Sequence, residues 1–375
     1  MSKTASVTKE KKAGAILAVA AEAAADAARC ADLVYVSDDE PGISRRKAGR
    51  GFAYYTADGT RITDADERMR IDALAIPPAY TDVWISPDPR GHIQATGRDD
   101  RDRKQYRYHP DWQAVRDDRK FRLILPFARA LPKIRARVDA DMRRHKPDFE
   151  KAVATVVMLL DRLLIRVGNS EYAEENKSFG LTTLRRRHLK IEGNQLRFRF
   201  RGKSGKAWNL DYSDRRICRA VRSMQDLPGQ HLFQYVDDDG TVHSVQSTDV
   251  NDYIRSASGG DFTSRQFRTW AATALCAVTL ADQLPGKSKR QTAHIVNEAL
   301  DSVAATLGNT RAVCRRSYVH PLVLETFEGG ALADELRSAP KLPGADLDLL
   351  HEGERIVLYW LTHYEKSTAG KRKAT

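Results

Sequence analysis

A change in hydrophobic patterning near residue 112 limits what this chain can fold into more than any other feature. Before it, short runs with high β propensity alternate with turn signals such as Asp-Gly and paired prolines. These runs cover residues 33–36, 51–55, 83–85 and 92–97. After it, apolar residues recur at helical spacing, most clearly over 121–138 and 149–167. The patterning predicts an α+β fold, with a small N-terminal β-sheet domain and a larger, mostly α-helical domain.

One stretch inside the helical part follows a different period. Over residues 196–201, leucine and phenylalanine alternate with arginine, which is the pattern of a half-buried strand. The turn at 202–205 then leads into a second β-prone run, 207–212. The helical domain is therefore predicted to contain a β-hairpin with Lys203 at its tip. The arginine face of this hairpin has two interpretations, phosphate contacts or a solvated surface.

Composition divides the chain further. The first residues are rich in lysine and alanine and offer little apolar surface for a core, so we expect disorder or a loose, alanine-rich helix. The last residues are strongly basic. In chain order we expect this N-terminal segment at 1–32, the β-rich domain at 33–112, the helical domain at 113–340, a C-terminal helical segment at 341–365 and a basic tail at 366–375.

The excess of basic residues indicates the kind of partner. Across 375 residues the formal net charge is +12 at pH 7. A surplus of lysine and arginine on a folded chain favours a polyanion, most often nucleic acid. An anionic membrane is the competing partner, but no apolar run is long enough to span one. The four cysteines are scattered without metal-ligand spacing, which fits a reducing cytoplasm, where we expect the protein to act.

Sequence signatures of nucleotide and metal cofactors are absent. Gly-Lys-Ser occurs at 202–204 and 286–288, but Arg197 and Ala281 stand where a phosphate-binding loop requires its first glycine. No His-Glu-x-x-His motif occurs. An enzyme acting on a polyanion would then need several positive side chains around one phosphorus atom, because negative charge builds on the phosphate oxygens in the transition state. We expect neither a cofactor nor a metal site.

Arginines inside otherwise apolar segments are the first candidates for that role. Arg166 ends a Leu-Leu-Ile run, and Arg268 lies near the start of an apolar helix. Arg265 precedes Arg268 by about one helical turn and shares its face. Arginine is rarely buried without a partner, so a salt bridge to an acid such as Asp161 or Asp261 is the alternative interpretation for each.

Lys203 and Tyr318 add two further chemical groups. At the tip of a hairpin, Lys203 is either a solvated turn residue or a general acid that the loop brings into a groove. The stretch before Tyr318 contains a helix end at Gly308 and a capping residue, Thr310, for the next helix. A tyrosine hydroxyl, with a pKa near ~10, is a poor nucleophile unless its anion is stabilised. Taken alone, Tyr318 fits an ordinary surface or half-buried tyrosine better than a catalytic one.

Arg166, Lys203, Arg268 and Tyr318 occur in this order, and the polar residue Asn309 precedes the tyrosine. This arrangement resembles the active site of type IB DNA topoisomerases, and it is close to that of the compact poxvirus-like and bacterial members. The resemblance covers almost the whole chain. The stretches that match are 83–86, 94–97, 103–109, 165–168, 179–184, 202–203, 267–269 and 308–321.

The resemblance implies a reaction at the DNA backbone. Tyr318 would attack a phosphorus in duplex DNA, expel a 5′-hydroxyl and remain joined to the 3′-phosphate. Arg166 and Arg268 would clamp the non-bridging oxygens, and Lys203 would protonate the leaving oxygen. Rotation about the intact strand, followed by religation, would relax positive and negative supercoils without ATP, cofactor or metal.

The resemblance also implies contacts with DNA and reveals one departure from the family. Many members have histidine where this chain has Asn309; both side chains can donate a hydrogen bond to a phosphate oxygen, so Asn309 is interpreted as a neutral donor. Gln105 and Tyr106 align with contacts near the cleaved site, and Tyr172 with a contact from the helical domain. Arg265 is a further predicted DNA contact. We expect a nucleoid-associated monomer whose two domains clamp duplex DNA.

Two other classes of protein compete with this interpretation. A tyrosine recombinase uses the same nucleophile but usually carries His-x-x-Arg at the second arginine, where this chain has arginine at both 265 and 268. The small β-rich domain ahead of the helical one also fits a topoisomerase better. A non-catalytic protein that binds duplex DNA would not need the tyrosine. We therefore expect a type IB topoisomerase.

Overall fold

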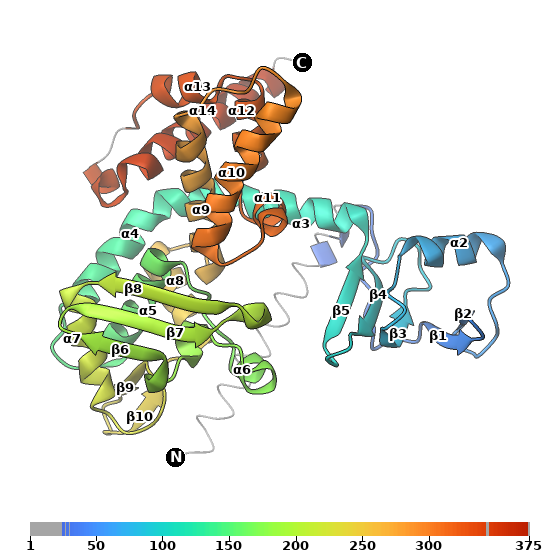
Figure 1. The fold of residues 1–375 in the computed structure, drawn as a ribbon, viewed down its shortest axis with the longest axis horizontal. Helices are drawn as coiled ribbons and strands as arrows, with labels where there is room; N and C mark the ends of the chain where they lie inside the picture. The colour runs from blue at the N-terminus through green and yellow to red at the C-terminus, as the bar shows by residue number, and fades with distance from the viewer. Residues whose placement is uncertain (1–24, 27, 30, 343–344, 374–375) are drawn as a thin grey trace. The chain divides into compact units, whose positions relative to one another are not determined.

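The computed structural model describes residues 25–26, 28–29, 31–342 and 345–373, and Figure 1 shows how the chain runs. Most of the N-terminal segment predicted at 1–32 lies outside the described residues. The chain forms two compact units, Met1–Lys120 and Phe121–Thr375. The first is built on strands and the second mainly on helices, so the predicted α+β class is confirmed.

The division between the units falls inside helix α3, Pro110–Arg122, and not at residue 112 as predicted. Trp112, in the first turn of α3, is buried against Ala28 and Leu33 of the N-terminal unit. The start of this helix therefore belongs to the sheet domain, although its sequence pattern is already helical.

One antiparallel sheet of five strands, in the order β2-β1-β3-β4-β5, forms the N-terminal unit together with a helix. These elements are β1 (Ile43–Ala48), β2 (Gly51–Tyr55), α2 (Ala65–Ala73), β3 (Thr81–Ile85), β4 (Ile93–Arg98) and β5 (Lys104–Tyr108). Ile71 of α2 packs against Ile43, Val83, Ile85 and Ala95 of the strands, and these side chains make the core of the unit.

The prediction for the first strand was wrong. The run 33–36 forms only an isolated bridge, between Val34 and Gly91, and no strand. The first strand of the sheet is instead β1, which reads Ile-Ser-Arg-Arg-Lys-Ala and has no apolar alternation to reveal it. Pairing with β2 and β3 decides its conformation, because strand preference depends on neighbours more than on the residues themselves.

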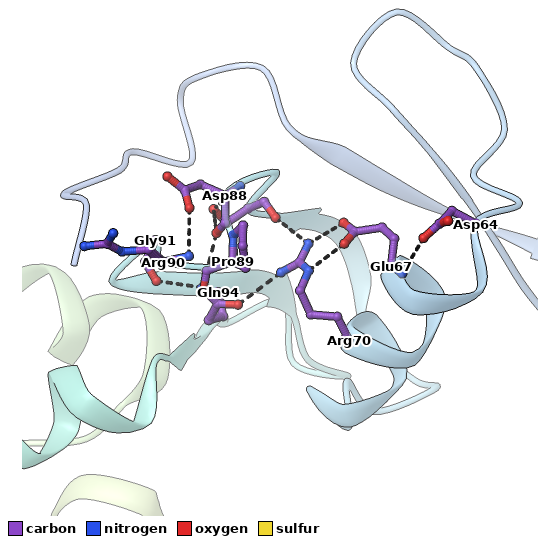
Figure 2. Close-up of polar contacts among 9 residues, drawn as sticks. Asp64, Glu67, Arg70, Asp88, Pro89, Arg90, Gly91 and Gln94 are labelled. Atoms are coloured by element: carbon purple, nitrogen blue, oxygen red, sulfur yellow. Dashed lines mark hydrogen bonds and ion pairs between the residues drawn. The ribbon is translucent and has the colours of Figure 1, made fainter. Parts of the chain in front are cut away.

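A buried glutamine, Gln94, holds the turn between β3 and β4 (Figure 2). Its Nε2 donates to the carbonyl oxygens of Gly91 at 2.7 Å and Pro89 at 3.0 Å. Its Oε1 accepts a hydrogen bond of 3.1 Å from Arg70 Nη1, and Arg70 also pairs with Glu67 at 2.6 Å. The amide thereby ties the turn to α2.

The C-terminal unit contains one large hydrophobic core. Its helices are α4 (Ile124–Met142), α5 (Phe149–Leu163), α6 (Ser170–Asn176), α7 (Arg215–Gln225), α8 (Ser247–Ser258), α9 (Ser264–Ala281), α10 (Lys289–Leu307), α11 (Arg311–Ser317), α12 (Pro321–Glu328), α13 (Leu332–Ser338) and α14 (Glu352–Lys373). Short 3-10 helices lie at Leu181–Thr183, Arg186–His188, Lys203–Gly205 and Ala345–Leu349. Residues 151–160 of α5 are all buried, so this helix lies inside the core and packs against α4 and α9.

The predicted hairpin is present in this unit. Its strands are β7 (Gln195–Arg201) and β8 (Ala207–Ser213), and β6 (Leu189–Glu192) completes a sheet in the order β6-β7-β8. A separate pair of strands consists of β9 (Gln234–Val236) and β10 (Val242–Ser244). Phe200 pairs with Trp208 near the tip, and their rings stack with centroids 6.0 Å apart. The apolar face of the hairpin therefore packs inward as the alternation predicts.

The C-terminal end of the chain differs from the prediction. Helix α14 continues to Lys373, so the residues predicted as a separate basic tail, 366–375, are helical as far as they are described. No proline follows residue 343, and lysine and arginine are good helix formers. Among the helices of the described residues, none is long and apolar enough to cross a membrane.

Candidate active site

Arg166 follows α5 in a segment whose backbone is tightly fixed. The helix ends at Leu164, which adopts the left-handed conformation with φ 53° and turns the chain away from the helix axis. The carbonyl of Arg166 accepts a hydrogen bond of 2.9 Å from Leu181 N. A Cβ added to Gly180 would lie 2.5 Å from Gly168 N, so the two chain segments cross at a distance that only glycine allows. This crossing holds Arg166 in place.

Arg268, on α9, has a buried guanidinium group. The residue is only 3% exposed, and it donates hydrogen bonds to the carbonyl oxygens of Leu164 and Leu307, the latter at 2.8 Å. Its Nε is buried and has no hydrogen-bond partner in the described part of the chain. Burial lowers the pKa of Arg268, because a cation without an anion is unfavourable there.

The two acids predicted as alternative salt-bridge partners pair with other arginines. Asp161 pairs with Arg135 at 2.9 Å, and Asp261 pairs with Arg255 at 3.2 Å. The salt-bridge alternative is therefore wrong for Arg268, which donates to the carbonyl oxygens of Leu164 and Leu307 and interacts favourably with Tyr318.

Tyr318 lies beside this cation. It occupies the C-cap position of α11, outside the helical conformation, at φ −128° and ψ −37°. The centroid of its ring is 5.2 Å from Arg268 Cζ. Burial raises the pKa of Tyr318, but the positive charges of Arg268 and Arg166, together with side-chain hydrogen bonds from Arg268 and Asn309, outweigh this effect. The pKa therefore lies below its ordinary value of 10.0. The surroundings thus favour the phenolate that a nucleophilic tyrosine requires.

Asn309 comes directly after Gly308, which ends α10 in the left-handed conformation with φ 63°. Its Oδ1 accepts a hydrogen bond of 2.7 Å from Arg166 Nη2. Its Nδ2 is buried and, within the described residues, has no hydrogen-bond partner. Asn309 therefore orients one arginine, and its side chain also helps to lower the pKa of Tyr318.

Lys203 lies exposed at the tip of the β7–β8 hairpin. Trp208 of β8 packs against this turn so closely that a Cβ on Gly202 would lie 2.6 Å from the indole nitrogen. The same ring packs against Gly308, where an added Cβ would lie 2.3 Å away. One tryptophan thus sets the spacing between the Lys203 turn and the Asn309 loop.

These segments enclose a pocket of about 630 Å³. Its wall includes four basic side chains and a tyrosine, namely Arg166, Lys203, Arg265, Arg268 and Tyr318. Of the described residues that line it, Glu175 alone is acidic. A concave surface with this excess of positive charge is suited to an anion such as a phosphate group.

The predicted DNA-contact residues lie on separate elements. Arg265 is exposed on α9 and lines the pocket. Gln105 and Tyr106 lie on β5 of the N-terminal unit, where Gln105 Nε2 donates to Asp99 at 2.9 Å and Tyr106 is 43% exposed. The backbone of Tyr172 belongs to α6, but its side chain lies outside what the structure describes.

Acidic neighbours partly neutralise the arginine face of the hairpin. Arg197 pairs with Glu192 at 3.0 Å, and Arg199 pairs with Asp211 at 2.9 Å. All four side chains are substantially exposed, and ion pairs of this kind contribute little to stability. For these two arginines the contacts favour the solvated-surface interpretation.

One residue that contacts Tyr318 was not predicted from the sequence. Thr273 is fully buried in α9, and its hydroxyl donates to the carbonyl oxygen of Tyr318 at 3.2 Å. A threonine among the alanines and leucines of α9 fits an ordinary small core residue, so no sequence signal indicated this contact.

Comparison with known proteins places the chain in a family. A model of the catalytic core of eukaryotic DNA topoisomerase I matches residues 109–332, and a model of the N-terminal domain of bacterial DNA topoisomerase IB matches residues 51–99. DNA topoisomerase 1B of Acanthamoeba polyphaga mimivirus is 32% identical over 295 residues, which cover 76% of this chain and 88% of that protein. DNA topoisomerase 1B of vaccinia virus (strain Copenhagen) is 20% identical over 290 residues, covering 73% and 89%.

The two-unit fold and these matches define an enzyme that changes the topology of DNA: the chain belongs to the type IB DNA topoisomerases. Within that family it is of the poxvirus-like and bacterial kind, because both the bacterial N-terminal domain and the viral enzymes match it. The resemblance inferred from the sequence is confirmed, and its activity is DNA relaxation. The recombinase and the non-catalytic alternatives are set aside.

Proposed function

We propose that the pocket at Tyr318 cleaves and religates one strand of duplex DNA through a covalent 3′-phosphotyrosyl intermediate. The observation that carries this proposal is the buried guanidinium of Arg268, which lies beside the Tyr318 ring and has no acidic partner among the described residues. A cation in such a place requires an anion to offset the cost of its burial. A backbone phosphate supplies the anion and brings its phosphorus next to the tyrosine hydroxyl.

Cleavage forms one bond at phosphorus and breaks another. The Tyr318 oxygen attacks as the phenolate after its proton passes to solvent, and the bond from phosphorus to the 5′ oxygen breaks. The 5′ oxygen leaves with a proton from Lys203, which acts as the general acid. The lowered pKa of Tyr318 supports its role as nucleophile. Religation reverses these steps, with the 5′-hydroxyl as nucleophile and Tyr318 as leaving group.

Three side chains hold the phosphate during both steps. Arg268, fixed by two carbonyl oxygens, and Arg166, oriented by Asn309, bind the non-bridging oxygens through paired N–H groups. Asn309 Nδ2 adds a neutral donor. Fixed positive charge at the point where negative charge develops lowers the barrier. We therefore infer that the reaction proceeds without a metal ion, and without ATP because the covalent intermediate conserves the phosphodiester bond energy.

Residues outside the pocket are proposed to make further contacts with the duplex. We infer that Arg265 and Tyr172 of the C-terminal unit, and Gln105 and Tyr106 of the N-terminal unit, contact the duplex around the cleaved phosphate. A monomer with a net charge of +12 gains affinity by neutralising phosphates. The free strand end rotates about the intact strand, so supercoils of either sign relax. The nucleoid in the cytoplasm is the inferred place of action.

Relaxation of supercoiled plasmid in EDTA and without ATP, compared between the wild type and Tyr318→Phe, tests the proposal. The wild type is expected to relax both signs of supercoil and to remain covalently joined to DNA when the reaction is stopped with denaturant. The phenylalanine variant is expected to bind DNA and melt like the wild type but to do neither. Relaxation by the variant would remove Tyr318 as nucleophile, and a requirement for divalent metal would contradict catalysis by the cationic cluster alone.

A further inference from the structure

We propose that Thr273 is a positioning residue that fixes the backbone of Tyr318 for its attack on DNA. This inference rests on the proposed role of Tyr318 as nucleophile. It adds a group that touches neither DNA nor the reacting atoms and acts through the main chain of the tyrosine.

The hydroxyl of Thr273 bridges both sides of the nucleophile. It donates to the carbonyl oxygen of Tyr318 at 3.2 Å and accepts from His320 N at 3.1 Å. Thr273 has no exposed surface, so water does not compete for these two hydrogen bonds. A single side chain therefore fixes a backbone acceptor and a backbone donor two residues apart.

The direction of this hydroxyl is unusual for a threonine in a helix. Such a hydroxyl commonly bonds to the carbonyl one turn earlier in its own helix. Thr155 of α5 bonds to Lys151 O at 2.7 Å in this way, and Thr269 of α9 bonds to Arg265 O at 3.3 Å. Thr273 instead makes its hydrogen bonds with the segment that carries Tyr318.

That segment needs external support because it is not helical. Tyr318 lies in the short connection between α11, which ends at Ser317, and α12, which begins at Pro321. The amides of Tyr318 and Val319 both bond to Cys314 O at 3.0 Å, which fixes the first half of the connection. Thr273 fixes the second half.

Thr273 and Arg268 belong to the same helix, α9. A capping box of Thr263 and Gln266 begins this helix, and Trp270, between Arg268 and Thr273, is buried in the core. The helix is thus a rigid frame that carries the cation beside the Tyr318 ring as well as the hydroxyl on its backbone. It sets the distance from nucleophile to phosphate-binding group.

Loss of the hydroxyl should affect the two halves of the reaction differently. Before cleavage, the phenolic oxygen reaches phosphorus only if the protein holds it there, and misplacement by about 1 Å can cost a factor of about 100 in rate. In the covalent intermediate the bond to phosphorus itself holds the tyrosine. Religation is therefore expected to depend less on Thr273 than cleavage does, and the fraction of covalent complex at equilibrium is expected to fall.

Single-turnover cleavage of a suicide DNA substrate, and religation from the isolated covalent complex, measure the two halves separately. Thr273→Val is expected to cleave about ten- to a hundredfold more slowly. Its religation rate and its DNA affinity are expected to stay within about twofold of the wild type. Thr273→Ser, which keeps the hydroxyl, is expected to cleave at close to the wild-type rate. Thr155→Val is the matched control, because it removes a fully buried helix threonine that has no contact with Tyr318.

Cleavage by Thr273→Val at the wild-type rate would overturn the proposal. Equal losses in cleavage and religation would also overturn it, since they indicate a disturbed pocket and not a misplaced nucleophile. If melting shows that the valine variant does not fold, Thr273→Ala provides the same comparison without a second methyl group. Cleavage by Tyr318→Phe in the same assay would instead refute the nucleophile itself, whatever the Thr273 variants do.

Discussion

Arg268 Nε and Asn309 Nδ2 are buried donors without a hydrogen-bond partner among the described residues. Leaving such a donor unsatisfied costs about 1–3 kcal/mol. Both atoms belong to residues that converge with Tyr318, and a bound phosphate offers the oxygen acceptors that both lack. In the proposed complex a DNA phosphate accepts hydrogen bonds from both donors, which favours the complex over the protein alone.

Asn309 tests this interpretation directly. Asn309→Ala removes the Nδ2 donor and the acceptor that orients Arg166, so single-turnover cleavage is expected to slow by about a hundredfold. Asn309→His retains a side-chain donor and is expected to remain active. Cleavage by the alanine variant at the wild-type rate would exclude Asn309 from the site.

The sequence predicted the pocket residues through a resemblance and not through their local pattern. Arg166, Arg268 and Tyr318 each had an ordinary alternative, and only their order along the chain favoured chemistry. In the structure Asp161 pairs with Arg135, so it is not the salt-bridge partner of Arg268. Thr273 could not be predicted, because the direction of its hydroxyl depends on how two distant helices pack.

Trp208 is the side chain that joins two elements of the site. Its ring fills the space beside Gly202 in the hairpin turn and beside Gly308 at the end of α10. Neither glycine has room for a Cβ, so the sheet and the helix approach each other through a single indole. At the scale of elements, the relative position of Lys203 and Asn309 depends on this contact.

Gly308→Ala is expected to disturb that contact. The added Cβ would lie 2.3 Å from the Trp208 ring. In addition, the φ of 63° at this position costs alanine about 1–2 kcal/mol in backbone strain. We expect a lower melting temperature and slower cleavage.

Gly193→Ala is the matched control, because Gly193 has φ 56° with nothing within 4 Å of an added Cβ. It is expected to lose stability but not activity; slow cleavage by Gly193→Ala would show that strain, not the Trp208 contact, matters.

Elements with a clear hydrophobic period were predictable from the sequence. Elements whose conformation depends on pairing with neighbouring strands were not. The hairpin at Lys203 follows from alternation over 196–201, because one of its faces is buried. Strand β1 is polar along most of its length and forms through pairing on both sides. The end of α14 was predicted as a tail because of its charge, although it contains no proline and its lysines and arginine are good helix formers.

A largely buried ionic cluster ties the C-terminal helix to the rest of the C-terminal unit. Arg135 of α4 pairs with Asp161 of α5 at 2.9 Å and with Glu354 of α14 at 2.7 Å. Glu354 also accepts a hydrogen bond of 3.0 Å from Trp270 Nε1 of α9. The family model of the catalytic core ends at residue 332, so Glu354 completes this cluster from outside the matched region.

Glu354→Gln is expected to destabilise the fold by about 3 kcal/mol at neutral pH, because it leaves Arg135 with one carboxylate instead of two. Burial raises the pKa of Glu354, but the hydrogen bond and positive charge of Arg135 lower it by a larger amount. The pKa therefore lies below its ordinary value of 4.5. The stabilisation is therefore full above that value and is lost as the pH falls through the lower folded-state pKa.

Denaturant unfolding at neutral pH and at low pH checks this expectation. The difference in unfolding free energy between the wild type and Glu354→Gln should shrink on acidification. Glu352→Gln, at the exposed start of α14, is the control and should change stability little at either pH. A difference that does not depend on pH would contradict the ionic explanation.

The anchoring of Tyr318 has a mechanical consequence at the scale of the whole molecule. While supercoils relax, the proposed phosphotyrosyl bond is the point where torque in the DNA is applied to the protein. The backbone at Tyr318 is held by hydrogen bonds to Cys314 O on one side and to the Thr273 hydroxyl on the other. Force on the tyrosine is therefore divided between α11, through Cys314, and the buried helix α9, through Thr273, so that the load does not fall on one short helix alone.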